Sequence, residues 1–107
     1  ETTYSYEIII GEDCSIDKTR DVIEQYSQRY PQIRPIYNKK NFGALVNYRN
    51  VISQIRGKYV CICDGDDQWL DKTKLQRQID ILEQNPDIGL VYSDLYMDIL
   101  SLKKGYV

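Results

Sequence analysis

"YSYEIIIGEDCSIDKT", residues 4–19, carries a strand signal, a loop signal and a helix signal in one continuous run. Residues 4–10 alternate and then become a run of β-branched side chains, which predicts a strand that ends at Gly11. A polar loop follows, and from about Asp17 apolar residues recur at helical spacing until Pro31. A strand that leads through a loop into a helix is the building unit of an α/β domain.

The rest of the chain repeats this alternation. Further strands are predicted at residues 33–38, 59–63 and 88–94, and further helices at residues 45–55 and 75–82. Pro35 cannot donate to a ladder and places the second strand at a sheet edge. Gly57 is predicted at the C′ position of the second helix, and Pro86 ends the third. The sequence thus predicts one α/β domain with a largely parallel sheet.

The composition limits the class of protein. The 107 residues are 42% hydrophobic and 28% charged, which is typical of one soluble globular domain. A formal charge of -2 argues against a nucleic-acid partner, and no apolar run reaches the roughly 20 residues that cross a bilayer, so we expect a cytoplasmic location. Cys61 and Cys63 alternate along a predicted strand, which favours buried thiols. Because the chain lacks an initiator methionine, we interpret it as a processed product or as a piece of a longer protein.

Acidic residues follow the predicted strands. In "YVCICDGDDQW", residues 59–69, Asp64, Asp66 and Asp67 come directly after an apolar run. Two carboxylates about 4 Å apart at an effective dielectric near 20 repel by roughly 4 kcal/mol, so we expect something bound there to offset the repulsion. Glu12 and Asp13 follow the first strand, and Asp94 follows the last. Open α/β sheets hold their ligands at these carboxyl ends.

The cluster of Asp64, Asp66 and Asp67 has several interpretations. A strand-to-helix turn with a helix cap and no further role stays open. An EF-hand loop is excluded, because Trp69 and Leu75 stand where Gly and Glu are required. A phosphatase-type aspartyl nucleophile fits poorly, since Gln68 stands where a hydroxyl residue belongs. The remaining interpretation is Mg²⁺ or Mn²⁺, bound by carboxylate oxygens and shared with the phosphates of a nucleotide.

Several motifs in order resemble those of the inverting family-two glycosyltransferases with the GT-A fold. They are "YEIIIGEDCSIDKT", "NFGALVNYRNVISQIRGKYVCICDGDDQW" and "KLQRQIDILEQNPDIGLVYSD", within residues 5–94. The resemblance implies a GT-A nucleotide-diphospho-sugar transferase domain, a Rossmann-like sheet with flanking helices. Residues 1–107 would be its donor-binding half, without the family's first strand and without the acceptor half.

The resemblance also implies roles for individual residues. Asp13 would accept a hydrogen bond from the donor's base, as expected for uracil N3. Asp64 and Asp66 would be the family's Asp-x-Asp metal-binding pair, with Asp66 the more direct metal ligand and Asp64 nearer the ribose or a metal-bound water. Asp67 would support the site or serve as a helix N-terminal charge.

Other residues carry weaker implications. Asn41, Gly43 and Asn47 match positions that flank the nucleotide, although Asn-x-Gly is also an ordinary turn. Glu12 stands where the family more often has Asp, and Cys14 stands where it has Gly, so the loop backbone is expected to differ there. Two further expectations are structural: Asp17 caps a helix, and Trp69 packs with the tyrosines in the core instead of stacking on a sugar.

The resemblance implies a parent enzyme that transfers a sugar from a nucleotide-diphosphate sugar, most simply a UDP-sugar, to a hydroxyl of an acceptor saccharide or lipid-linked glycan. It would use Mn²⁺ or Mg²⁺, in bacterial-type cell-surface polysaccharide or glycoconjugate synthesis, at the inner face of the membrane. Its general base is expected downstream of Val107, and Asp94 is not that base on motif grounds. The 107 residues alone are therefore expected to show no turnover.

Two alternatives in function and one structural problem remain open. The chain could be a noncatalytic nucleotide-sugar-binding or scaffolding piece, or a nucleotidyltransferase that uses a similar sheet and acidic pair. Without the family's first strand the sheet would contain a gap, and unpaired edges invite pairing. We expect either that residues 4–10 and 59–63 pair directly or that the chain self-associates through exposed sheet edges.

Overall fold

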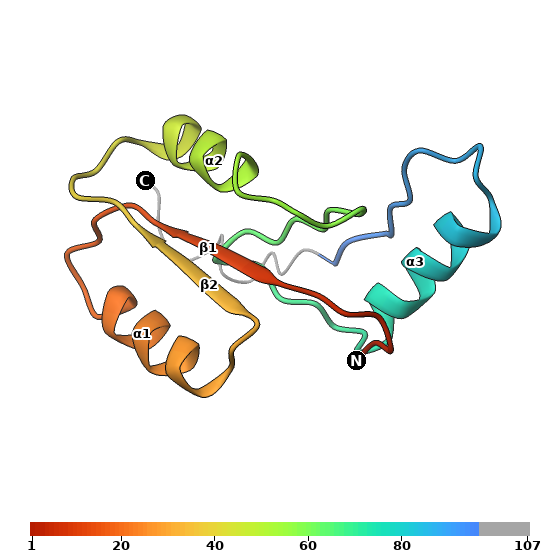
Figure 1. The fold of residues 1–107 in the computed structure, drawn as a ribbon, viewed down its shortest axis with the longest axis horizontal. Coiled ribbons are helices and arrows are strands. Elements are labelled where there is room, and N and C mark those ends of the chain that lie inside the picture. The colour runs from red at the N-terminus through yellow and green to blue at the C-terminus, as the bar shows by residue number, and fades with distance from the viewer. Residues whose placement is uncertain (97–107) are drawn as a thin grey trace. The chain divides into compact units, whose positions relative to one another are not determined.

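The computed structural model describes residues 1–96, which fall into two compact units. Residues 2–68 form one unit, and Glu1 with the chain from Trp69 onward forms the other. The first unit holds β1 (Ile8–Glu12), α1 (Thr19–Arg29), β2 (Ile33–Tyr37) and α2 (Ala44–Ile52), and the second holds α3 (Lys74–Gln84) (Figure 1). The α/β class is confirmed in the first unit.

The two strands form a parallel pair joined by α1. The register runs from Ile8 opposite Ile33 to Glu12 opposite Tyr37, with Pro35 opposite Ile10. Parallel strands need a crossover connection, and the predicted helix after Asp17 supplies it as α1. Within residues 1–96, β2 pairs with β1 alone, so Pro35 lies on an edge strand as predicted.

The helices α1 and α2 cover opposite faces of this pair. A Cβ placed on Gly11 would meet the side chains of Val51 and Asn47 in α2, whereas the next residue, Glu12, bonds Arg20 in α1. Because successive strand residues point to opposite faces, the two helices lie on opposite sides, and Figure 1 shows the strands running between them.

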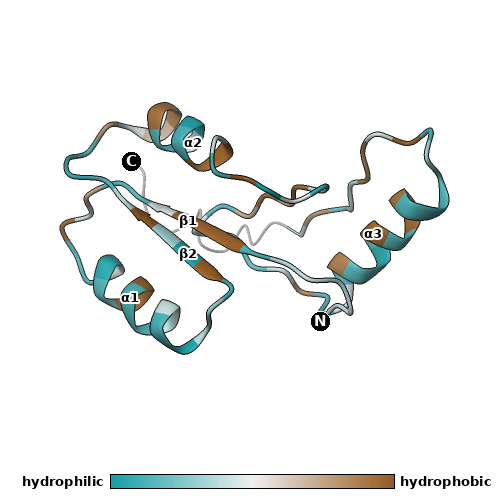
Figure 2. Ribbon diagram, in the orientation of Figure 1, coloured by the Kyte–Doolittle hydropathy of each residue, from teal (hydrophilic) through white to brown (hydrophobic). Residues whose placement is uncertain are grey.

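The hydrophobic core of the described residues is small. Figure 2 shows hydrophobic residues in both strands and along each helix. Among residues 1–96, however, Ile23 is the one buried hydrophobic side chain, at 8% exposed. The expectation that Trp69 and the tyrosines pack in a core is wrong for Trp69, Tyr26, Tyr30 and Tyr48, which are all exposed. Two strands and two helices do not provide enough surface to cover them.

Two predicted boundaries are corrected. β1 begins at Ile8, not at residue 4, because its partner β2 begins at Ile33, directly opposite. α2 ends at Ile52, so Gly57 is not its C′ residue. The N–H of Ser53 reaches the carbonyl of Arg49, but Ile55 donates only to the carbonyl three residues back, which is a turn.

The strands predicted at residues 59–63 and 88–94 do not form. A strand needs a neighbour, and the outer edge of β1 is occupied at one point by a side chain: Asn47 donates to the carbonyl of Gly11 at 3.0 Å. The carbonyl of Glu12 points toward β2, where it accepts from the N–H of Asn38. Because successive carbonyls alternate in direction, the carbonyl of Gly11 points to the opposite edge of β1. Direct pairing of residues 4–10 with 59–63 is therefore wrong, and Cys61 and Cys63 are exposed rather than buried.

The second unit is described by its helix. α3 confirms the helix predicted over residues 75–82, and it stops before Pro86. The Asn85 side chain donates to the carbonyl of Ile81 at 2.8 Å, which satisfies one of the last carbonyls of the helix. Within residues 1–96, none of the helices combines the length and hydrophobicity that a membrane span requires.

Candidate functional site

Asp13 lies at the carboxyl end of β1 and is the centre of a hydrogen-bond network. Its Oδ1 accepts from the Asn38 side chain at 2.8 Å and from the backbone N–H of Phe42 at 2.9 Å. Its Oδ2 accepts from the backbone N–H of Gly43 at 2.8 Å. One carboxylate therefore fixes the turn that leads into α2. We call Asp13, Asn38, Phe42, Gly43 and Asn47 the Asp13 network.

These donors stabilise the charged form of Asp13. The backbone N–H of Phe42 lowers the pKa of this carboxyl, desolvation opposes it, and the donors of Asn38 and Gly43 add to the lowering. The net result is a pKa below the ordinary value. The ionised form of Asp13, which only accepts hydrogen bonds, is thus favoured over the protonated form.

Gly43 supplies a backbone conformation that other residues rarely adopt. Its φ is 83°, in the left-handed region, and it precedes the first residue of α2. Its N–H also donates to the Asn41 side-chain oxygen at 3.0 Å, and its carbonyl accepts from the N–H of Asn47. The structure therefore brings the candidate site residues Asp13, Asn41, Gly43 and Asn47 together.

Asn38 is a member of the network that the sequence analysis missed. It is buried at 7% exposed and donates from one amide nitrogen to Asp13 and, at 3.0 Å, to Asn47. The signal was a polar residue at the end of the strand predicted over residues 33–38, at the same sheet edge as Asp13.

Glu12 forms a second buried contact beside the network. Its carboxylate is buried and accepts from Arg20 Nε at 2.7 Å and from the backbone N–H of Ser15. Burial raises the pKa of Glu12, but the bonds from Ser15 and Arg20 outweigh it, so the pKa lies below its ordinary value. Glu12 is thus a structural anchor for the loop after β1.

The loop after β1 also contains Cys14, which stands where the family more often has Gly. Its φ is 60°, so a residue with a side chain occupies the left-handed region that glycine favours. Three residues after Cys14, Asp17 accepts from the N–H of Thr19, the first residue of α1, at 2.9 Å. The hydroxyl and N–H of Thr19 lower the pKa of Asp17. The N-cap of α1 is Lys18 and carries no side-chain capping bond, so the prediction that Asp17 is the cap is wrong.

The residues 64–67 form a β-turn that we call the acidic turn. The N–H of Asp67 donates to the carbonyl of Asp64 at 3.0 Å, and the Cys63 thiol lies 3.9 Å from the carbonyl of Asp67. Asp64, Asp66 and Asp67 are all exposed. Within residues 1–96 no hydrogen bond joins the acidic turn to the Asp13 network.

This exposure changes the electrostatic argument made from the sequence. At the dielectric of bulk water, two carboxylates about 4 Å apart repel by only about 1 kcal/mol, against roughly 4 kcal/mol at a partly buried site. The fold thus tolerates the acidic turn without a bound cation. Among residues 1–96, moreover, no group of three or more His, Cys, Asp or Glu side chains is arranged to hold a metal ion.

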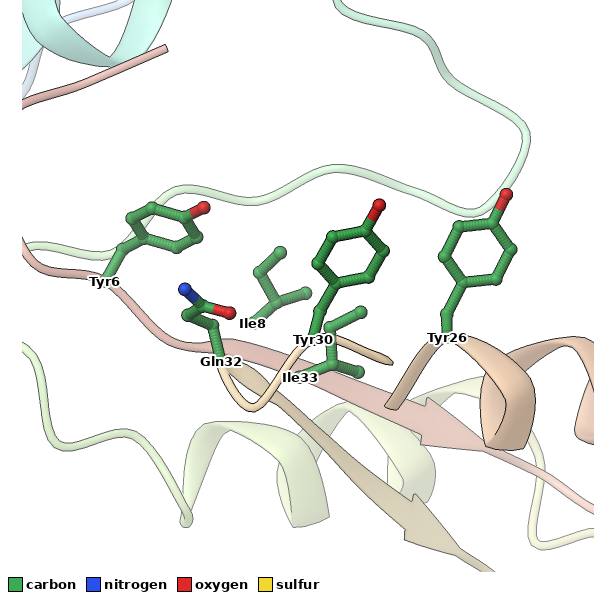
Figure 3. A pocket seen from close by; sticks show the side chains of 6 residues that line it. All are labelled: Tyr6, Ile8, Tyr26, Tyr30, Gln32 and Ile33. Carbon is green, nitrogen blue, oxygen red and sulfur yellow. The ribbon is translucent and has the colours of Figure 1, made fainter. Parts of the chain in front are cut away.

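A hollow lies at the other end of the sheet. It is lined by Tyr6, Ile8, Tyr26, Tyr30, Gln32 and Ile33. Figure 3 shows the three tyrosine rings projecting to the same side as Ile8 and Ile33, which are the first residues of β1 and β2. None of the candidate site residues lines this hollow. The candidate site is therefore the network at the strand carboxyl ends.

Comparisons with known proteins agree with the sequence motifs. Residues 1–97 match the model of glycosyl transferase family 2. An uncharacterised protein of Mycobacterium tuberculosis is 41% identical over 85% of this chain and 27% of its own length. The Bacillus subtilis protein TuaG, named as a teichuronic acid biosynthesis glycosyltransferase, is 38% identical over 72% of this chain and 30% of its own length.

A third relative is an uncharacterised glycosyltransferase of Methanocaldococcus jannaschii, 34% identical over 83% of this chain and 30% of its own length. The chain thus spans 27–30% of the length of these relatives. No solved structure matches it. The family match covers most of the chain, so the chain belongs to glycosyl transferase family 2.

Proposed function

We propose that this chain is the nucleotide-sugar-binding part of an inverting, metal-dependent glycosyltransferase with the GT-A fold. The observation that carries the proposal is the Asp13 network, a charged acceptor held at the carboxyl end of a parallel strand. That edge is where open α/β sheets bind ligands. The family match supports the transferase class.

The contact with the nucleotide would be made by Asp13. A carboxylate has about four acceptor positions, and three are used by Asn38, Phe42 and Gly43. The remaining position, on Oδ2, suits an N–H donor such as uracil N3, which favours a UDP-sugar as the donor. Asn41, Gly43 and Asn47 would flank the nucleotide by holding the turn beside it.

The metal, Mn²⁺ or Mg²⁺, would be held by the acidic turn. Carboxylate oxygens are the ligands that these cations prefer, so the donor set fits in its chemistry. Within residues 1–96, no three such side chains are arranged around one cation position. One or two protein carboxylates are sufficient, however, when phosphate oxygens and water complete the coordination shell of the metal. Asp66 would be the ligand, with Asp64 beside the ribose or a bound water and Asp67 in support. A bound cation would neutralise charge on the diphosphate leaving group.

The rest of the chemistry would belong to the parent protein. The acceptor, a saccharide or lipid-linked glycan, and the general base would be held by segments outside this chain, so we expect no turnover from the 107 residues alone. The name of TuaG, a teichuronic acid biosynthesis glycosyltransferase, supports a role in polysaccharide synthesis. We further propose that the parent protein transfers a hexose on the cytoplasmic side of the membrane, for a cell-surface polysaccharide or glycoconjugate.

Calorimetric titration of the 107-residue chain tests the proposal. Uridine, guanosine and thymidine diphosphates are titrated with and without Mn²⁺, against Asp66→Ala and against Asp80→Ala as a carboxylate control outside the site. We expect uridine diphosphate to bind in the presence of Mn²⁺, with a clear loss in Asp66→Ala and none in Asp80→Ala. Failure of all three nucleotides to bind would contradict the proposal.

One observation favours a second candidate, a noncatalytic nucleotide-sugar-binding or scaffolding piece. The carboxylates of the acidic turn are exposed and are not gathered around a cation position. This candidate predicts nucleotide binding that is the same with and without Mn²⁺. A nucleotidyltransferase would instead bind a nucleoside triphosphate in preference to the diphosphate, so the same titration with uridine triphosphate separates it.

A further inference from the structure

Asn38 is fixed in place by its own backbone. It follows β2 directly, its N–H donates to the carbonyl of Glu12 at 2.9 Å, and its carbonyl accepts from Arg20 at 2.9 Å. These bonds tie the residue to the end of β1 and to α1. Its side chain therefore starts from a rigid position beside Asp13.

The side-chain amide of Asn38 connects two other side chains. Its nitrogen donates to Asp13 Oδ1 at 2.8 Å and to Asn47 Oδ1 at 3.0 Å. Asn47 in turn donates from its nitrogen to the carbonyl of Gly11. A carboxylate and a backbone carbonyl only accept, so both amides have one consistent orientation. The chain of bonds links the end of β1, the residue after β2, and α2.

This arrangement decides which oxygen of Asp13 stays available. Asn38 and the N–H of Phe42 both bond Oδ1, whereas Oδ2 has Gly43 as its donor. We infer that Asn38 is a positioning residue, which saturates Asp13 Oδ1 and so leaves Oδ2 to accept the N–H of a nucleotide base. The nucleotide part of this inference rests on the proposed function; the coupling of Asn38 to Asp13 does not.

A merely structural Asn38 would behave differently. Its substitution would lower the stability of the unit. In the fraction of the variant that is still folded, the pKa of Asp13 and the affinity for nucleotide would be those of the wild type. A positioning Asn38 changes both, because the donor that stabilises the charged form of Asp13 is removed. The test therefore measures Asp13 directly.

The variant is Asn38→Ala, and the matched control is Tyr37→Phe. Tyr37 is the neighbouring residue, and the change removes its 2.9 Å bond to Glu24 without touching Asp13. The carboxyl carbon of Asp13 is followed by NMR across the acid range in wild type, variant and control. We expect the Asp13 pKa to rise in Asn38→Ala and to stay unchanged in Tyr37→Phe.

Nucleotide affinity is measured on the same samples with uridine diphosphate and Mn²⁺. We expect Asn38→Ala to bind roughly tenfold more weakly, the size expected for one lost charge-assisted hydrogen bond, and Tyr37→Phe to bind as wild type does. A folded Asn38→Ala with an unchanged Asp13 titration overturns the inference, as does a changed titration with unchanged affinity.

Two provisions keep the test decisive. If Asn38→Ala does not fold, the side-chain nitrogen resonance of Asn38 is followed in the wild-type chain instead. We expect it to titrate at the same pH as the carboxyl carbon of Asp13. Different titration midpoints for the two resonances would refute the coupling. If wild type binds no nucleotide, the proposed function fails, and with it the nucleotide part of the inference. The coupling is still confirmed or refuted by the carbon titration.

Discussion

The Asp13 network and the acidic turn both place carboxylates in loops, but the carboxylate of Asp13 is hydrogen-bonded and those of the acidic turn are exposed. Asp13 receives three N–H donors, and these donors lower its pKa. The carboxylates of the acidic turn are exposed, and the turn is held by its backbone. A cluster of like charges on the surface costs little, whereas one carboxylate satisfied by distant donors organises the structure around it.

The comparison teaches that the number of acidic residues in a motif is a poor guide to its structural weight. "DGDD", residues 64–67, is the more conspicuous pattern in the sequence. The single Asp13 instead joins β1 to the residue after β2 and to the start of α2. Substitutions should therefore damage the network and spare the turn.

The largest difference is expected between Gly11, which lies beside the Asp13 network, and Gly65, which lies in the acidic turn. In Gly11→Ala the new Cβ would lie 2.5 Å from Val51 Cγ2 and 2.7 Å from Asn47 Oδ1, so these two residues of α2 must move. We expect a loss of about 2 kcal/mol in the free energy of unfolding, as for other overpacked sites. Gly65→Ala meets nothing within 4 Å and should change it by less than about 0.5 kcal/mol. Urea unfolding measures both, and equal losses would contradict the contrast.

A smaller difference is expected between Asp13→Asn and Asp66→Asn. Asp13→Asn removes the charge that three donors stabilise and should lower the thermal midpoint by several degrees, whereas Asp66→Asn should leave it unchanged. Circular dichroism melts at neutral pH would show this. A stable Asp13→Asn protein would mean that the network contributes little.

The same pair sharpens the comparison at low pH. The folded pKa of Asp13 is lowered from 3.8, so its contribution to stability is complete above that value and is lost as the pH falls through the lower folded pKa. The gap between wild type and Asp13→Asn should therefore close in strong acid. A gap that persists there would show that the charge is not its source.

The smallest effect is expected at Cys14, beside the network. A non-glycine residue in the left-handed region destabilises the folded state by roughly 1–2 kcal/mol. Replacing it with glycine removes this strain, but glycine also loses more conformational entropy on folding, which offsets part of the gain. Cys14→Gly should therefore stabilise the chain by up to about 1 kcal/mol. Ser15→Gly, the neighbouring control, should destabilise it slightly. The denaturant midpoints of both variants are compared with that of the wild type. If Cys14→Gly and Ser15→Gly shift the midpoint in the same direction, the backbone of Cys14 is not strained.

The local elements were predictable because their signals are local. The helical spacing before Pro31 gave α1, Pro35 gave the edge strand β2, and the run before Pro86 gave α3. The motifs in order along the chain predicted the family, and the family match confirmed it. The contacts of Gly43 with Asp13 and Asn41 are seen in the structure alone. The identity of the metal, the nucleotide and the acceptor did not follow from any of these.

The failures share one cause, which is that a strand and a buried side chain both depend on a partner. Residues 59–63 have the composition of a strand but no neighbour to pair with in the described structure, so Cys61 and Cys63 are exposed. The predicted helix over residues 45–55 stopped at Ile52, where the backbone tightened into turns. Periodicity reports what a segment favours, whereas pairing decides what it becomes.

The sequence by itself determined the α/β order of elements, the glycine turn before α2 and membership of the glycosyltransferase family, because these depend on short-range preferences and ordered motifs. Only the tertiary structure decided that Asp13 and Asn38 act together. Asp13's donors lie 25 to 30 residues away along the chain, and hydrogen bonds depend on distances of about 3 Å that no spacing in the sequence can specify.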